Sequence, residues 1–229
     1  REELFKEMAD MITGIKREKE MPIGYCFSYP TESVPGGDAK LLRWTKGVDI
    51  KEMIGEVVGK PLLDYLNERN KIKFTNIKVL NDTVASLFAG LTDSSYDAYI
   101  GLIVGTGTKF EEKFDAQKLT SIMNYPDIYK EVYVEVAQWI YSRSAQLVAA
   151  SLTGLIMLLK SYNKNIRKIC LVAEGSLFWS KNRKDKNYNM IVMEKLRELF
   201  SLFGLEDVEV DIKSMNNANL IGTGIAALS

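Results

Sequence analysis

Apolar and polar side chains alternate with two different periods in the first half of the chain, and these periods predict a succession of helices and strands. Residues 4–15 carry apolar side chains at helical spacing, whereas the run from Ile23 to Tyr29 alternates as a half-buried strand does. Pro30 ends that strand because proline lacks the amide hydrogen that a strand ladder needs. The remaining elements of this half are a strand at 74–80, a helix from Thr83 and a strand at 96–104.

Turn and capping residues mark the segments between these elements. Gly36-Gly37 predicts a turn. Asp49 and Glu52 have the spacing of a capping box, which predicts a helix through Val58. Pro61 suits the first turn of a further helix over residues 62–68. The pattern up to Thr108 is therefore that of an α/β protein.

Beyond Thr108 the pattern becomes mainly helical. The predicted elements are helices at 118–124, 129–162, 187–203 and 220–228, and strands at 166–173 and 208–212. The charged stretch Lys109–Lys113 fits neither a strand nor a helix, although a glycine turn after a strand normally leads into one of them. We therefore expect a segment to be missing near residues 108–110, and another before residue 1, because Arg1 lies within the first amphipathic helix.

Composition narrows the functional classes. The 229 residues are 46% apolar and 26% charged, as in an ordinary globular protein of one large or two small domains, which excludes disordered, collagen-like and disulfide-framework chains. Lys and Arg number 30, as do Asp and Glu, so no net charge attracts nucleic acid or an anionic membrane, and a small-molecule partner is favoured. The longest apolar stretch, residues 147–159, contains Ser151, Thr153 and Gly154 and predicts a buried helix instead of a membrane span.

The reactive side chains are few in kind. The chain has no histidine, which excludes histidine-dependent nucleophiles, bases and metal sites, so acid–base chemistry falls to carboxylates, lysines or tyrosines. Cys26 and Cys170 lie in separate strand-like runs and indicate neither a disulfide framework nor a zinc site. A reducing cytoplasm fits this cysteine content.

Two loops carry polar groups that suit sugar hydroxyls. Ser28 follows a strand in the sequence Phe-Ser-Tyr-Pro, where it is either a ligand group or a surface serine beside a turn. Thr45 and Lys46 place a hydroxyl beside an ammonium group just before Gly47. That pair can donate to sugar hydroxyls or to phosphate, and it also fits a simple capped loop.

Two further motifs follow predicted strands. Asn81 and Asp82 stand where a strand ends and a helix begins, which is where open α/β sheets bind ligands and also where helix caps occur. A carboxylate beside an amide can take a proton from an alcohol and hold a neighbouring hydroxyl. The Gly105–Thr108 turn, Gly-Thr-Gly-Thr, offers amides and hydroxyls to phosphate oxygens, but it lacks the Gly-Lys-Ser/Thr ending of a Walker A loop.

Taken together and in this order, the four motifs resemble the sugar-binding loops and the second phosphate loop of the hexokinase family. The resemblance runs from about Leu4 to Thr108 and resumes, less sharply, from about Tyr133 to the end. It includes Arg143-Ser144-Ala145 and Glu174-Gly175-Ser176. It implies an actin-like, ribonuclease-H-type α/β fold with two lobes around a cleft. The small lobe would comprise residues 1–80, with the closing helix 220–229 returning to it, and the large lobe residues 81–219.

The resemblance also implies an activity, the transfer of the γ-phosphate of ATP to the 6-hydroxyl of glucose or a related hexose, early in glycolysis. Asp82 would accept the proton of that hydroxyl. Mg²⁺ would bind to the nucleotide and not to a protein site. A cytoplasmic homodimer is compatible with these expectations. The implied ligand contacts are hexose hydroxyls at Ser28, Thr45, Lys46, Asn81 and Asp82, ATP phosphates at Gly105, Thr106, Gly107 and Thr108, and adenosine at Gly175 and Ser176.

The chain also departs from the family pattern. It lacks the Asp-Leu-Gly-Gly-Thr-Asn type of phosphate loop, and Glu111 and Glu112 do not inherit the roles of the family's sugar-binding glutamates. The Gly-Ser-Gly that usually precedes the last helix is replaced by Asn216-Asn217-Ala218-Asn219. Two alternatives stay open: a catalytically weak sugar sensor of the same fold, which the retained Asp82 disfavours, and an unrelated α/β nucleotide-binding module.

Overall fold

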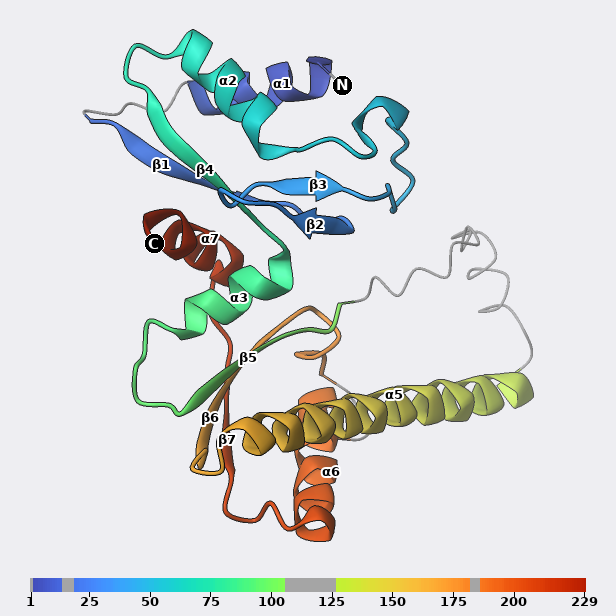
Figure 1. The fold of residues 1–229 in the computed structure, drawn as a ribbon. Coiled ribbons are helices and arrows are strands. Elements are labelled where there is room, and N and C mark those ends of the chain that lie inside the picture. Colours follow the sequence, from blue (N-terminus) through green and yellow to red (C-terminus); the bar gives the residue numbers. More distant parts are fainter. Residues whose placement is uncertain (1, 14–18, 106–126, 182–185) are drawn as a thin grey trace. The chain divides into compact units, whose positions relative to one another are not determined.

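Contacts divide the chain into two compact units, which we describe separately (Figure 1). The computed structural model describes residues 2–13, 19–105, 127–181 and 186–229. The first unit comprises Arg1–Ser94, Tyr99–Leu102 and Ser214–Ser229, and the second comprises Ser95–Ala98 and Ile103–Lys213. The lobe boundaries expected at residues 80 and 220 stay a prediction, because a compact unit of contacts is not the same thing as a lobe that moves.

The first unit is built on two parallel strands, β1 (Met21–Cys26) and β4 (Phe74–Leu80). Helices α1 (Glu2–Thr13) and α2 (Gly59–Arg69) lie over one face of this pair, and α3 (Asp82–Gly90) and α7 (Ala218–Leu228) lie on the other side (Figure 1). The core beneath α1 and α2 contains fully or almost fully buried side chains from α1, α2 and β4, among them Phe5, Ala9, Leu62, Leu66, Phe74 and Ile77.

The two faces of strand β1 carry different side chains. Ile23 and Tyr25 face the apolar core, and between them Gly24 faces α7. A Cβ atom at Gly24 would lie 2.3 Å from the carbonyl oxygen of Thr223. Because the side of the strand that faces α7 carries no side chain at this position, the α7 backbone can approach it closely.

The predicted elements of this unit are confirmed to within a few residues with two exceptions, although the strand expected to run to Tyr29 already ends at Cys26. Asp49 and Glu52 do not open a helix through Val58; only a 3-10 turn, Lys51–Met53, forms there, with no side-chain cap at its start. Gly55 at φ +85° and a β-bridge between Lys40 and Val57 keep the rest of this segment non-helical. The second exception is a hairpin that the prediction missed, β2 (Thr31–Ser33) and β3 (Ala39–Leu41), which closes over the predicted Gly36-Gly37 turn.

The three-stranded sheet has the order β5 (Ala98–Ile103), β6 (Lys168–Glu174), β7 (Glu209–Lys213), and β6 pairs in parallel with β7. The central strand β6 is buried from Ile169 to Ala173, as expected for a strand covered on both faces. Helices α5 (Asp127–Tyr162) and α6 (Tyr188–Phe203) pack against each other in the second unit. These elements match the prediction to within a few residues, whereas the predicted helix at 118–124 and the break expected near 108–110 lie outside the described residues.

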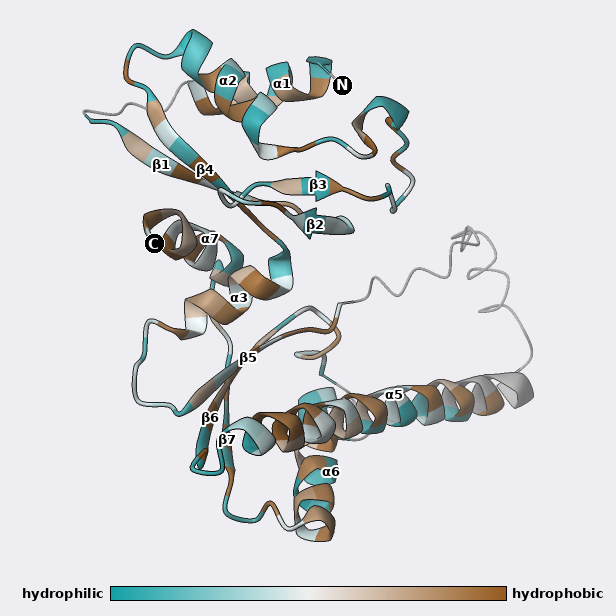
Figure 2. Cartoon of the chain, viewed as in Figure 1, coloured by the Kyte–Doolittle hydropathy of each residue, from teal (hydrophilic) through white to brown (hydrophobic). Residues whose placement is uncertain are grey.

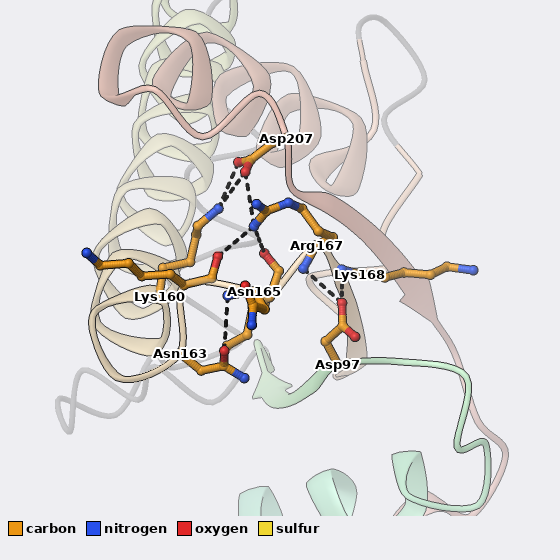
Figure 3. Close-up of polar contacts among 9 residues, drawn as sticks. Asp97, Lys160, Asn163, Asn165, Arg167, Lys168 and Asp207 are labelled. Atoms are coloured by element: carbon orange, nitrogen blue, oxygen red, sulfur yellow. Dashed lines mark hydrogen bonds and ion pairs between the residues drawn. The ribbon is translucent and has the colours of Figure 1, made fainter.

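A polar network fixes the start of β6 in the second unit (Figure 3). The Asp97 carboxylate accepts the backbone N–H groups of Arg167 and Lys168, both at 2.8 Å. These two bonds, with Arg167 first, hold the pKa of Asp97 below its usual range. Asp207 accepts from the Lys160 ammonium at 2.8 Å and pairs with the Arg167 guanidinium at 3.1 Å. The network therefore joins the end of α5, the start of β6 and the segment before β7.

Helix α5 corrects the expectation of a buried helix over residues 147–159. Ala149, Leu152 and Ile156 are buried, but Leu147 and Leu158 are half-exposed, so one stripe of the helix is packed and another is not. Apolar positions run along its length in Figure 2. By length and composition, Glu135–Tyr162 resembles a membrane span, with a mean hydropathy of 1.3. The core helix of a globular protein has the same composition, so this is weak evidence for a membrane.

Candidate active site

The first unit brings three of the predicted loops to one edge of its parallel strand pair. Cys26 at the end of β1 pairs with Leu80 at the end of β4, and the N–H of Phe27 donates to the carbonyl of Leu80 at 2.8 Å. Because the strands are parallel and end in register, the residues that follow them, Ser28 on one and Asn81 on the other, leave from the same edge. This is the edge at which α/β sheets bind ligands.

Aromatic packing holds the loop of Ser28 against the loop of Lys46. The rings of Tyr29 and Trp44 meet edge to face with centroids 4.7 Å apart, and Phe27 lies 5.0 Å from Tyr29. The indole N–H of Trp44 donates to the carbonyl of Ile50 at 2.7 Å. Such contacts stabilise by about 1 kcal/mol each beyond the area they bury, so the two loops form one rigid surface.

Lys46 reaches back to the serine loop. Its ammonium donates to the carbonyl of Ser28 at 3.0 Å and lies 5.4 Å from the centre of the Tyr29 ring. Lys46 has φ +59° and Gly47 φ +75°, so the chain makes a left-handed turn that points the lysine toward Ser28. Thr45 precedes it, half-buried, and its carbonyl accepts the N–H of Val48 at 3.3 Å. The ammonium retains two further donors for a ligand.

Asn81 caps helix α3, as one of the two interpretations of this motif requires. Its side-chain oxygen accepts the N–H of Thr83 at 3.0 Å, and Oδ1 of Asp82 accepts the same N–H at 2.8 Å. Each of the two side chains keeps hydrogen-bonding groups that the cap does not use. Within the described part of the chain, no group accepts a hydrogen bond from the amide NH₂ of Asn81 and none donates to Oδ2 of Asp82.

Cys26, which no sequence pattern singles out, ends β1 at this strand edge, opposite Leu80 of β4. Burial raises the pKa of Cys26, and the Asp82 carboxylate raises it further. Hydrogen bonds with the side chains of Ser28 and Thr223, and then the positive charge of Lys46, act in the opposite direction. One hydrogen-bond partner of the thiol, Thr223, belongs to α7 at the far end of the sequence, and no local sequence pattern indicates this contact.

In the second unit, the two turns expected to bind nucleotide lie side by side. The N–H of Val104 donates to the carbonyl of Glu174 at 2.9 Å, which joins the strand before Gly105 to the strand before Gly175. Gly175 has φ +104°, and a Cβ atom there would lie 2.2 Å from the carbonyl oxygen of Val104. Only glycine fits this position. Ser176 follows on the surface, whereas Thr106, Gly107 and Thr108 lie outside the described residues.

Other features of the resemblance have structural roles. Ser144 shares a hydrogen bond of 2.7 Å with the hydroxyl of Tyr188 and so joins α5 to α6, and Ala145 is fully buried. Asn217 begins α7 in the left-handed region, at φ +58°. Cys26 and Cys170 are both free thiols. Among the described residues, no group of His, Cys, Asp or Glu side chains could hold a metal ion.

Comparison with known proteins places the chain in a family. The models of the hexokinase family match residues 1–92 and 109–229, and the second match alone covers more than half of the chain. A hexokinase of Brugia malayi is 34% identical over 115 residues, which are 47% of this chain and 20% of that protein. Hexokinase-2 of Schizosaccharomyces pombe is 39% identical over 111 residues, 46% of this chain and 24% of that protein. The matched segments thus span about a fifth to a quarter of these relatives.

A solved structure of a hexokinase from Schistosoma mansoni, complexed with glucose, matches all of this chain and 76% of its own, with a TM-score of 0.71 and 17% identity. This likeness confirms the expected actin-like α/β fold. The family match also excludes the alternative of an unrelated α/β nucleotide-binding module. The chain belongs to the hexokinase family.

Proposed function

We propose that the protein is an ATP-dependent hexokinase that phosphorylates the 6-hydroxyl of glucose or a related hexose. The observation that carries the proposal is the shared edge of the parallel strands β1 and β4, from which the loops of Ser28 and Asp82 leave and at which the Lys46 ammonium donates to the carbonyl of Ser28 at 3.0 Å. The loops at this edge supply one proton acceptor and several hydrogen-bond donors. Transfer of a phosphoryl group to a sugar alcohol requires these groups and needs no histidine.

Asp82 is the proposed base. Its Oδ1 is held by the Thr83 N–H at 2.8 Å, which fixes the orientation of the carboxylate. The other oxygen, Oδ2, then accepts the proton of the substrate hydroxyl as that oxygen becomes the nucleophile. A fixed acceptor that needs no reorganisation contributes about 10²- to 10⁴-fold to the rate of such a step.

The neighbouring residues position the hexose. Lys46 and the amide of Asn81 donate to hydroxyl oxygens, and the hydroxyls of Ser28 and Thr45 both donate and accept. Because Lys46 also binds the carbonyl of Ser28 at 3.0 Å, the two loops move as one body when the sugar binds. Holding the alcohol in line with the acceptor converts a collision between two molecules into a step within one complex.

The nucleotide site is proposed on the adjoining turns of the second unit. The backbone of Gly105 and the exposed hydroxyl of Ser176 suit phosphate and ribose oxygens, and Gly175 brings the two turns together. Thr106, Gly107 and Thr108 complete the proposed phosphate contacts. ATP with Mg²⁺ supplies the phosphoryl group and neutralises the charge that develops on it. Hard oxygen ligands from the phosphates explain why the protein needs few ligands of its own for this ion.

Glucose is the first substrate to test, since the Schistosoma mansoni relative was solved with it. A cytoplasmic location and a homodimer remain proposals from composition and family. The catalytically weak sugar sensor is the second candidate, because it would keep the same sugar loops.

One pair of measurements separates the two candidates. Calorimetry measures glucose binding without nucleotide, and a coupled assay measures glucose 6-phosphate formed from ATP. The hexokinase shows both binding and turnover, whereas the sensor binds glucose and forms no product. A protein that neither binds a hexose nor forms its phosphate refutes both candidates.

A further inference from the structure

A buried polar contact joins α3 to α7 one turn behind Asp82. The hydroxyl of Ser86, which is fully buried, donates to Oδ1 of Asn219 at 2.8 Å. The same hydroxyl lies 3.1 Å from the carbonyl oxygen of Asp82, four residues earlier on α3. The contact spans 133 positions of the sequence. It therefore ties α3, one turn after Asp82, to the first turn of α7.

The hydroxyl of Ser86 has one hydrogen to donate. Without Asn219, that hydrogen can go only to the Asp82 carbonyl within the same helix, and the hydroxyl no longer ties α3 to α7. With Asn219 as the closer acceptor, the hydroxyl joins the two helices. The orientation of the first turn, and of the carboxylate it carries, thus depends on a side chain of α7.

Helix α7 is a firm support for such a contact. A Cβ atom at Gly222 would lie 1.7 Å from the carbonyl oxygen of Ala85, so the two helix backbones are in direct contact. On its other side, α7 places the Thr223 carbonyl against Gly24 of β1. The Thr223 hydroxyl donates to the carbonyl of Asn219. Asn219 is therefore held relative to both β1 and α3.

We propose that Asn219 is a positioning residue for Asp82, acting through the hydroxyl of Ser86. The proposal rests on the proposed function, in which Asp82 is the base. It gives a role to one of the residues that replace the family's Gly-Ser-Gly before the last helix. Asn219 touches neither substrate nor nucleotide in this account, and its effect is confined to the geometry of α3.

Matched variants of the intact protein test the proposal. Asn219→Leu keeps the size of the side chain and removes the acceptor, whereas Asn219→Asp keeps an acceptor oxygen. Ser86→Ala removes the donor, and Leu220→Ala, at an exposed neighbour on α7, is the control. Each variant is assayed for kcat with glucose and ATP at a temperature where all are folded, and for hydrogen exchange of the α3 amides.

We expect kcat to fall about tenfold in Asn219→Leu and in Ser86→Ala, since a displacement of about 1 Å can lower a rate by up to 10²-fold. Asn219→Asp and Leu220→Ala should stay within about threefold of the parent. The α3 amides should exchange about tenfold faster in the two impaired variants. The double variant Ser86→Ala/Asn219→Leu should recover stability, because neither side chain is left without its inter-helix partner, but its kcat should stay as low as in either single variant, because the tie between the two helices is still absent.

The outcomes separate this proposal from the proposed function. Normal kcat in Asn219→Leu, with Asp82→Asn inactive, overturns the positioning role alone. A double variant that regains both stability and kcat also overturns it, because the contact is then merely structural. Normal turnover in Asp82→Asn overturns the assignment of the base, and the positioning role with it. Unchanged hydrogen exchange in Asn219→Leu contradicts the proposal even where no turnover is measured.

Discussion

The close approach of α3 and α7 predicts opposite effects for alanine at two glycines of one helix. An alanine Cβ at Gly222 would lie 1.7 Å from the Ala85 carbonyl oxygen, half of the 3.4 Å at which ordinary contact begins. The contacted atom is backbone, so it cannot rotate away and the helices must separate. At Gly224 nothing lies within 4 Å of the added atom, so that position is the matched control.

The magnitudes follow from two opposing terms. Alanine favours a helix over glycine by about 1 kcal/mol, which applies to both variants. Overpacking against a rigid neighbour typically costs about 1–3 kcal/mol and here falls at the upper end or beyond. We therefore expect Gly224→Ala to raise the free energy of unfolding by up to about 1 kcal/mol, and Gly222→Ala to lower it by about 2 kcal/mol or more.

Urea unfolding followed by circular dichroism and tryptophan fluorescence measures both values. The two variants should differ by about 3 kcal/mol, which at a typical slope of about 2 kcal/mol per molar urea separates their midpoints by more than about 1 M. Equal midpoints would show that the helices are not in backbone contact. Since α3 carries Asp82, Gly222→Ala should also lower kcat, whereas Gly224→Ala should leave it near the parent value.

Three further predictions concern other parts of the chain. Gly175→Ala, which forces a side chain into φ +104° and against the Val104 carbonyl, should lower the free energy of unfolding by about 2 kcal/mol or more, and a thermal midpoint equal to that of the parent would contradict it. The raised pKa of Cys26 favours the neutral thiol in the folded state. The contribution of this thiol to stability should therefore be complete below the unfolded-state pKa near 9.0 and should be lost as pH rises through the folded-state pKa. Above the folded-state pKa, the parent should lose more stability than Cys26→Ala does. The lowered pKa of Asp97 has the opposite effect: the contribution of this carboxylate to stability should be present above pH 3.8 and lost as pH falls through the folded-state pKa. Acid titration should therefore destabilise the parent more than Asp97→Asn. Identical acid titrations of the parent and the variant would contradict this prediction.

Local signals in the sequence predict much of this fold. Residues 74–80 were predicted as a strand and form β4 with the same bounds, because apolar and β-branched residues there are flanked by clear breaks. A helix cap is one of the two interpretations that the sequence leaves open for Asn81, and the structure contains that cap. In both cases the interactions that determine the structure join residues close together in the sequence, so a local sequence pattern can predict them.

The errors arise where distant parts of the chain decide the structure. The capping box at Asp49 and Glu52 predicts a helix, but the bridge between Lys40 and Val57 competes with it, and the segment stays open. Strands of three residues, such as Thr31–Ser33, are too short to show a period.

The same limit applies to the candidate active site. Its polar residues were found individually, since each lies just after a strand or beside a glycine. The contact of Cys26 with Thr223 and the contact between Ser86 and Asn219 depend on tertiary packing that no local pattern contains. The roles of the site residues themselves stay predictions.

The catalytic role of Asp82 is the central claim, and one substitution tests it most directly. Asp82→Asn keeps the shape of the side chain and an oxygen that can accept the Thr83 N–H, but it removes the proton acceptor. A coupled glucose 6-phosphate assay on the full-length variant, with calorimetry of glucose binding beside it, should show a folded protein that binds glucose within about tenfold of the parent and loses at least about a hundredfold in kcat. A folded variant with near-normal turnover would show that Asp82 serves only as part of a helix cap.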